Sequence, residues 1–370
     1  MALMTAVGMM SGTSMDGIDV ALVRTDGEEA VEFGPSMAVE YDSQTRARIG
    51  EALAAAKSLS DRNARPGCLD EVEAMLTQLH ADALNKFLGE HELTPAEIDL
   101  VGFHGQTVLH RPDIGLTVQL GDGAALARAG GIDVIFDMRA RDMTLGGEGA
   151  PLVPVFHRAL AKAEGKELPV AFVNIGGIAN ISCVGEGGEL VAFDTGPGNN
   201  LIDQWMQQEA GVPFDQGGKV ASEGTLIQEV VERYMAAPYF TKRVPKSLDR
   251  SDFAPLLPGE AELSDGARTL ANVSARSIMG ASDHLPVAPK CWIISGGGRL
   301  NQSIMEDLRA LAVARGAEVV SAEDAGFDGD MMEAQAFAYL AVRSAKGLPL
   351  TYPTTTGCRE PATGGVLARA

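Results

Sequence analysis

The sequence predicts an α/β protein of two domains with mixed β-sheets. Its 370 residues are enough for roughly two to three domains of about 150 residues each. Two apolar segments, residues 5–23 and 170–184, each have the pattern of a strand, a glycine-rich turn and a second strand. Both are followed by further strands and by helical patterns. This alternation favours helices layered on mixed sheets over an antiparallel sandwich.

The spacing of apolar residues and the short apolar runs locate the other elements. We expect strands at 100–103, 132–136, 189–193 and 291–295, and helices at 45–59, 68–88, 158–167, 201–209, 302–315 and 331–345. The two glycine-rich segments look like copies of one ancestral unit. A proline-containing stretch at 149–157 separates them. It places the domain boundary near residue 165, so the predicted domains are 1–165 and 166–370.

Composition and charge exclude several classes of partner. The chain has 30 basic and 50 acidic residues, a net charge of -20 that repels nucleic acids and anionic lipids. Its 4 cysteines form no CxxC pair, which argues against a zinc knuckle or a disulfide framework. There is no basic signal region, and no apolar run reaches the roughly 18 residues of a membrane span. We therefore expect a cytoplasmic protein with no membrane or nucleic-acid partner.

The turn of the first opening is a candidate phosphate site. It comprises Gly12, Thr13, Ser14, Met15, Asp16, Gly17, Ile18 and Asp19. Its glycines allow several backbone N–H groups to point at one anion together with the hydroxyls of Thr13 and Ser14. Asp16 and Asp19 offer oxygen ligands to Mg²⁺, directly or through water. An ordinary glycine-rich hairpin is the alternative interpretation.

Two common nucleotide-binding motifs are absent. Gly218-Lys219 lacks the Ser or Thr that completes a Walker A loop, and Asn301 stands where G-x-G-x-x-G needs its last glycine. Gly296, Gly297 and Gly298 nevertheless form a three-glycine turn after an apolar strand. Such a turn allows a flat ligand such as a nucleoside to approach the backbone closely, although a plain strand-to-helix turn has the same pattern.

Polar residues follow several predicted strands, at the edge where open α/β sheets bind ligands. Asp194 is expected at the end of strand 189–193, where glycine neighbours would let a substrate approach a general base. Capping of the following turn is the alternative for this residue. Arg139 follows strand 132–136 and could bind a carboxylate bidentately, or form a surface ion pair.

Taken together, these segments resemble the anhydro-N-acetylmuramic acid kinases, a family of the sugar kinase, heat-shock ATPase and actin superfamily. The resemblance covers nearly the whole chain, and the matching sequence motifs occur in the same order as in the family. They include GMMSGTSMDGIDVALV near the start, VGFHGQTVLHRP at 101–112, GDGAALA at 121–127, RARDMTLGGEGAPLVPVFH at 139–157, NIGGIANIS at 174–182, FDTGPGNNLIDQW at 193–205, PKSLDRSDF at 245–253, SGGGRLN at 295–301 and EAQAFAYLA at 333–341.

This resemblance implies a two-domain actin-like ATPase (ribonuclease H-like) fold with an interdomain cleft, commonly in a homodimer. It also implies that ATP, Mg²⁺ and water convert 1,6-anhydro-N-acetylmuramate to N-acetylmuramate 6-phosphate, a step of bacterial cell-wall recycling. Matched to the family strings, Asp194 is the expected catalytic base, residues 12–19 bind the ATP phosphates and 296–298 lie against adenosine. The expected sugar-binding residues are Gln106, Arg139, Asp142 and Glu333.

Three alternatives stay open from the sequence. Glu333 opens a predicted helix, where a carboxylate is favoured by the helix dipole whether or not it binds sugar. The chain could also be another sugar or carboxylate kinase of the same superfamily, without the water-activating role of Asp194. A non-catalytic ATP-binding switch would require a peptide-binding appendage or a polymer surface, and the sequence has no separate module of that kind.

Overall fold

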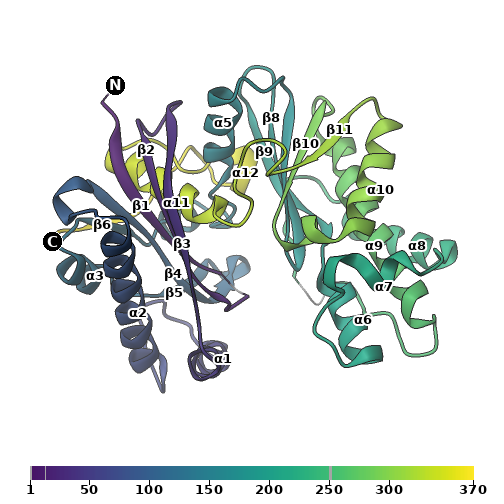
Figure 1. The fold of residues 1–370 in the computed structure, drawn as a ribbon, viewed down its shortest axis with the longest axis horizontal. Coiled ribbons are helices and arrows are strands. Elements are labelled where there is room, and N and C mark those ends of the chain that lie inside the picture. Colours follow the sequence, from purple (N-terminus) through teal and green to yellow (C-terminus); the bar gives the residue numbers. More distant parts are fainter. Residues whose placement is uncertain (1, 13, 250–251) are drawn as a thin grey trace. The chain divides into compact units, whose positions relative to one another are not determined.

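The computed structural model describes residues 2–12, 14–249 and 252–370, which form two compact units (Figure 1). Unit 1 comprises Met1–Glu164 and Met331–Ala370, and unit 2 comprises Gly165–Asp330. Each unit has a β-sheet and helices of its own. No helix in the described ranges combines the length and apolar character needed to cross a membrane.

The sheet of unit 1 is mixed. In the described part of the chain its seven strands are β1 (Met4–Ser11), β2 (Gly17–Thr25), β3 (Val31–Glu40), β4 (Leu100–Arg111), β5 (Leu116–Leu120), β6 (Val134–Phe136) and β12 (Val366–Ala368). Strands β1, β2 and β3 form an antiparallel meander, whereas β4 and β6 continue parallel to β1. Strand β5 pairs with β4, and β12 pairs with β6, in antiparallel fashion.

The helices of unit 1 come from both parts of its sequence, and several of them begin at a capping aspartate or at a proline. They are α1 (Ser43–Ala56), α2 (Leu69–Glu90), α3 (Gly123–Gly130), α4 (Ala140–Thr144), α5 (Pro154–Ala163), α11 (Met332–Ala345) and α12 (Pro353–Thr356). The Asp42 carboxylate accepts a hydrogen bond from the Thr45 amide, and Asp122 caps α3 in the same way. Helix α5 starts at a proline four residues earlier than predicted and ends at Ala163.

Helix α11 packs directly on the backbone of the unit 1 sheet. Gly8 of β1 and Gly102 of β4 lie opposite each other in the parallel pair. A Cβ on either glycine would overlap a backbone carbonyl of α11, that of Ala334 or of Phe337. Since successive residues of a strand face opposite sides, the neighbours of Gly102 point the other way, into the core shared with α1 and α2.

The C-terminal segment belongs to unit 1, whereas the sequence-based division assigned it to the second domain. The structure passes from unit 1 to unit 2 after Glu164 and returns after Asp330. The C-terminal segment is attached to unit 1 because α11 packs on β1, β2 and β4, and because β12 pairs with β6. Figure 1 shows α11 beside strands β1, β2 and β3 of the unit 1 sheet.

Unit 2 repeats the strand order of unit 1. Its strands are β7 (Val170–Ile175), β8 (Ile178–Val184), β9 (Leu190–Pro197), β10 (Cys291–Ser295) and β11 (Glu318–Ser321). The described strands follow the order β11-β10-β7-β8-β9, with β7, β8 and β9 antiparallel and β10 and β11 parallel to β7. In unit 1 the corresponding order is β6-β4-β1-β2-β3. The two units therefore share one ribonuclease H-like topology, as the two glycine-rich openings predict.

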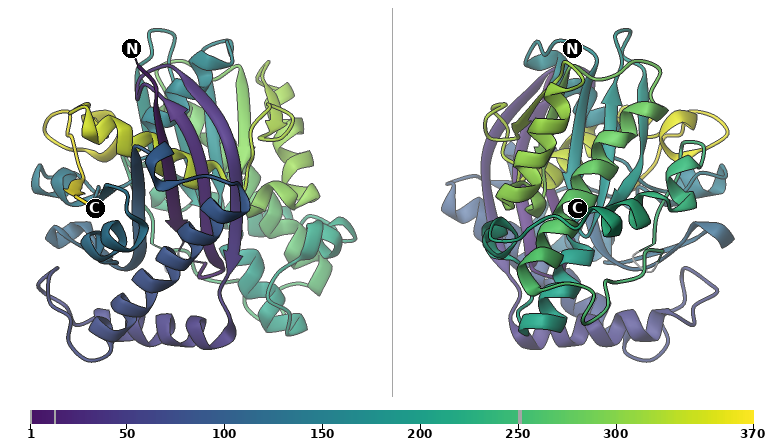
Figure 2. Two further views of the ribbon diagram at one scale, coloured as in Figure 1. Left: turned by 60° about the vertical axis from the view of Figure 1, so that its left-hand side comes forward. Right: turned by 90° about the vertical axis from the view of Figure 1, so that its right-hand side faces the viewer.

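The helices of unit 2 cover one face of its sheet, onto which the right-hand view of Figure 2 looks. They are α6 (Asn200–Ala210), α7 (Lys219–Ser222), α8 (Gln228–Met235), α9 (Leu263–Gly280) and α10 (Gln302–Val313). Alternate residues of β7, namely Ala171, Val173 and Ile175, enter their shared core. Trp205 of α6 is fully buried against α9, where its indole N–H donates to the Leu263 carbonyl at 2.8 Å.

The contact between the sheet and α11 generates a prediction for stability. Changing Gly102→Ala should lower the free energy of unfolding by about 1–3 kcal/mol, because the added methyl group overpacks a rigid contact. Gly50→Ala is the matched control, since Gly50 is exposed within α1 with open space around it. Its free energy of unfolding should rise by roughly 0.5–1 kcal/mol. Equal effects in urea titrations would contradict the packing account.

Candidate active site

The glycine-rich turn of unit 1 joins β1 to β2 and is shorter than the segment chosen from sequence. Gly17, Ile18 and Asp19 belong to β2, and the side chain of Ile18 is 1% exposed within the core. Of the turn itself, Gly12, Ser14, Met15 and Asp16 are described, whereas Thr13 lies outside the described residues. Met15 has a positive φ of 60°, and its amide donates to the Gly12 carbonyl at 3.2 Å, so the turn reverses tightly.

Gln106 braces this turn. The Ser11 hydroxyl donates to Gln106 Oε1 at 2.7 Å, and Gln106 Nε2 donates to the Gly12 carbonyl at 3.1 Å. Tyr41 OH lies 2.9 Å from the same Ser11 hydroxyl, and burial raises the pKa of this tyrosine to about 12. Gln106 is 1% exposed, so its amide fixes the hairpin in this conformation. Its expected contact with the sugar stays a prediction.

Arg139 is a half-buried cation of unit 1. It donates to the Gly149 carbonyl through NH1 at 2.9 Å and to His104 Nε2 through NH2 at 3.0 Å. His104 must therefore be neutral, with Nε2 as the acceptor. Burial lowers the pKa of Arg139 to about 10, while the negative charges of Glu333 and Asp142 act in the opposite direction. The structure thus groups three of the four predicted sugar-binding residues.

Asp142 organises the loop that follows Arg139. It is 1% exposed, and its Oδ2 accepts from the Gly149 amide at 2.7 Å. Its Oδ1 accepts from the hydroxyls of Thr351 at 2.5 Å and Thr356 at 2.7 Å, both in the C-terminal segment. These bonds give Asp142 a role in holding the backbone. Its contact with the sugar stays a prediction.

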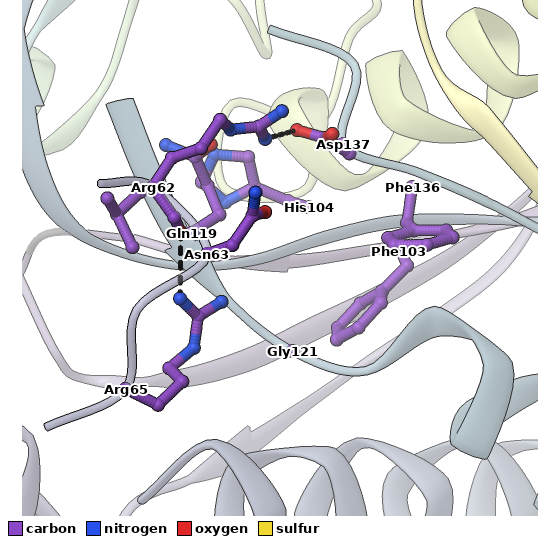
Figure 3. A pocket seen from close by; sticks show the side chains of 10 residues that line it. Arg62, Asn63, Arg65, Phe103, His104, Gln119, Gly121, Phe136 and Asp137 are labelled. Carbon is purple, nitrogen blue, oxygen red and sulfur yellow. Dashed lines mark hydrogen bonds and ion pairs between the residues drawn. The ribbon is translucent and has the colours of Figure 1, made fainter. Parts of the chain in front are cut away.

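A cavity of about 110 Å³ lies beside His104 and is shown in Figure 3. The lining includes two guanidinium groups, and each has a carboxylate partner. Arg62 pairs with Asp137, and Arg65 forms a bidentate pair with Glu73 at 2.9 Å. The charges at this cavity are therefore balanced by the protein itself.

Asp194 lies inside β9, not at the end of a strand as the sequence predicted. Pairing with β8 continues beyond it to Pro197, which faces Ile178. Between Asp194 and Gly196 the register shifts, so that Thr195 is an extra residue in β9. Such bulges re-aim side chains and are frequent beside active sites. Asp194 is half-buried on this rigid element.

A segment at 239–248 forms hydrogen bonds with Asp194, and no role was predicted for it from the sequence. The Asp194 amide donates to the Lys246 carbonyl at 3.0 Å, and Tyr239 OH donates to the Asp194 carbonyl at 2.5 Å. The Leu248 amide donates to Asp194 Oδ2 at 2.9 Å. The backbone and one carboxylate oxygen of Asp194 are thus held by one loop. The only sequence signal was the family-like string at 245–253.

The three-glycine turn of unit 2 follows β10, as predicted. Gly296 has a φ of 74° and approaches the side chain of Asn174, while Gly298 abuts Ile175. A side chain on either glycine would collide with the end of β7. Arg299, the residue after the turn, is buried and forms ion pairs of 2.9 Å with both Glu323 and Asp330. These ion pairs stabilise the position of the turn. Helix α10 then begins with Asn301 as its cap.

The hairpin of unit 1 offers a suitable donor set for Mg²⁺. Asp16 is exposed in the turn and Asp19 is half-buried in β2. Mg²⁺ is usually held by one or two carboxylates together with substrate phosphates and waters, so these two aspartates are of the residue type that the ion prefers. Among the residues that the structure describes, no group of three or more His, Cys, Asp or Glu is placed to hold a metal.

The two units share one topology, with a glycine-rich hairpin in unit 1 and an aspartate on a strand of unit 2. This fold is that of the actin-like ATPases, a class that includes sugar kinases. The family model "Anhydro-N-acetylmuramic acid kinase" matches residues 4–370. A protein of that name from Agrobacterium fabrum is 55% identical over 99% of both chains. One from Rhizobium etli is 54% identical over 98% of both chains.

Among solved structures, component A of (R)-2-hydroxyglutaryl-CoA dehydratase from Acidaminococcus fermentans is similar, with a TM-score of 0.48 and 12% identity, covering 93% of this chain and 99% of that one. The chain belongs to the anhydro-N-acetylmuramic acid kinase family. It is an ATP-dependent sugar kinase, and the alternative of a non-catalytic switch is wrong.

The bond from Arg139 to His104 generates a prediction for pH dependence. Burial, assisted by the charge of Arg139, lowers the pKa of His104 from 6.5 to about 3. Below pH 6.5, His104 therefore binds a proton in the unfolded chain but stays neutral in the folded protein. The free energy of unfolding falls as a result. His104→Gln keeps an acceptor for Arg139 but does not titrate. Between pH 6.5 and 5 its free energy of unfolding should fall by about 2 kcal/mol less than that of the wild type. Identical pH slopes in urea titrations would refute this assignment.

Proposed function

We propose that this protein phosphorylates 1,6-anhydro-N-acetylmuramate at O6 while opening its anhydro ring, with ATP and water as co-substrates. The products are N-acetylmuramate 6-phosphate and ADP, and the reaction serves cell-wall recycling. The observation that carries the proposal is Asp194, held on a strand by three hydrogen bonds in a chain that matches the family from end to end. We also propose that the enzyme acts in the cytoplasm as a homodimer.

The chemistry requires one base. The 1,6-anhydro bridge is an acetal, so its opening is a glycoside hydrolysis in which O6 is the leaving group. The same O6 is the atom that accepts the γ-phosphoryl group. Because phosphorus captures the departing oxygen, no general acid is needed to protonate it.

Asp194 would act as that base. Its carboxylate takes a proton from water as the water oxygen bonds to C1, and the C1–O6 bond breaks. O6 then bonds to the γ-phosphorus, and the bond from that phosphorus to the β,γ-bridging oxygen breaks to release ADP. The Leu248 amide on Oδ2 and the two backbone bonds support this role, because they fix the carboxylate before the substrate arrives.

Nucleotide binding would use both glycine-rich turns. The Gly12–Asp19 hairpin would receive the phosphates, with its shape maintained by Gln106, and the Gly296–Gly298 turn would lie against adenosine. Asp16 and Asp19 would hold Mg²⁺, which supplies positive charge to the transferred phosphoryl group when bound.

The sugar would bind near Arg139 and Glu333. Three of the five N–H groups of Arg139 donate to His104 and Gly149. The two others can bind the lactyl carboxylate, the one charged group of the anhydro sugar. Glu333, at the start of α11, can accept hydrogen bonds from sugar hydroxyls.

The role of Asp194 is tested by Asp194→Asn. This change keeps the size of the side chain but removes the base, so turnover should fall by at least about a hundredfold while ATP binding, measured by calorimetry, persists. Asp324→Asn is the control, because Asp324 is an exposed aspartate of the same unit. Turnover of Asp194→Asn close to that of the wild type would refute the assignment.

The fate of the water oxygen is tested by running the reaction in ¹⁸O-labelled water. Mass spectrometry should find the label in the hydroxyl on C1 of the product, because water attacks carbon and the original O6 receives phosphorus. Label in the phosphate would instead show that water attacks ATP.

A further inference from the structure

A buried ammonium group lies beside the residues that hold Asp194. Lys246 is 6% exposed. Burial lowers its pKa to about 8, and the neighbouring Lys242 acts in the same direction. No carboxylate of the described residues forms an ion pair with it. An ammonium group without a carboxylate partner gains no stability from an ion pair, so its effect depends on its other contacts.

The ammonium group joins the two ends of the loop that grips Asp194. Lys246 Nζ donates to the Tyr239 carbonyl at 3.2 Å and lies 4.6 Å from the centre of the Tyr239 ring. It also lies 3.3 Å from His284 Nε2, a nitrogen that is 2.8 Å from the Phe240 carbonyl. The side chain of Lys246 therefore links the two ends of the segment 239–246 through its contacts with Tyr239.

The same two residues contact Asp194 through other atoms. Tyr239 uses its hydroxyl to bind the Asp194 carbonyl, and Lys246 uses its own carbonyl to accept from the Asp194 amide. Two residues further along, the Leu248 amide binds the carboxylate. A shift between Tyr239 and Lys246 would therefore be transmitted to the oxygen atoms of Asp194.

We propose that Lys246 is a positioning residue, whose ammonium group holds the 239–248 loop closed so that the Asp194 carboxylate keeps one orientation toward the attacking water. The inference rests on the proposed function of Asp194 as the base. It concerns turnover and not nucleotide affinity, because the hairpin and the three-glycine turn lie on other elements.

The test compares Lys246→Met with Lys242→Met. Methionine replaces the buried ammonium with an apolar side chain of similar length. Lys242 is exposed in the same loop, with Nζ 5.5 Å from the centre of the same tyrosine ring, so its replacement is a matched control. For Lys246→Met we expect kcat to fall by about tenfold to a hundredfold, with the KM for ATP within about twofold of the wild type. The melting temperature should be unchanged or higher, because a buried charge without a carboxylate partner has been removed.

A merely structural lysine would give the opposite pattern, with a lower melting temperature and an unchanged kcat. That result, or failure of Lys246→Met to fold, would overturn the inference. So would an equal loss of kcat in Lys242→Met. Measuring Asp194→Asn in parallel separates the two proposals. If Asp194→Asn is inactive and Lys246→Met is fully active, only the role of Lys246 is wrong, whereas an active Asp194→Asn removes the base itself.

Discussion

The hydrogen bonds between Asp194 and the 239–248 loop fix the one carboxylate on which the proposed reaction depends. A flexible aspartate would have to be ordered in each catalytic cycle, at a cost in free energy. Here a paired strand supplies the backbone, a bulge lies directly after the residue, and the loop holds one carboxylate oxygen atom. A catalytic group that is oriented before the substrate binds lowers the barrier, because it need not be ordered during the reaction.

The two units show how one topology serves different chemistry. Both begin with a strand, a glycine-rich turn and an antiparallel return strand. In unit 1 the turn carries Asp16, and Gln106 holds its shape from the neighbouring strand. In unit 2 the third strand of the meander carries Asp194. The proposed roles therefore depend on side chains placed at different positions of the same framework.

Much of the fold could be predicted because it has local causes. Strand patterns, helix periodicity and the glycine turns depend on neighbouring residues, and the prediction of Asp194 as the base came from the family strings. The contacts between distant residues could not be predicted in this way. Asp142 accepts hydrogen bonds from Thr351 and Thr356, which lie more than two hundred residues further along the chain. No local sequence pattern predicts that α11 packs on the sheet of unit 1. The hydrogen bonds from the 239–248 loop to Asp194 also join residues about fifty positions apart, so local patterns could not predict them.

The most direct test of the account is a crystal structure with 1,6-anhydro-N-acetylmuramate and a non-hydrolysable ATP analogue bound together. The account predicts a water molecule within about 2.6–3.2 Å of a carboxylate oxygen of Asp194, on the side of C1 opposite O6. It also predicts O6 facing the γ-phosphorus. A carboxylate turned away from the anomeric carbon, with the 239–248 loop still closed around it, would contradict the central claim.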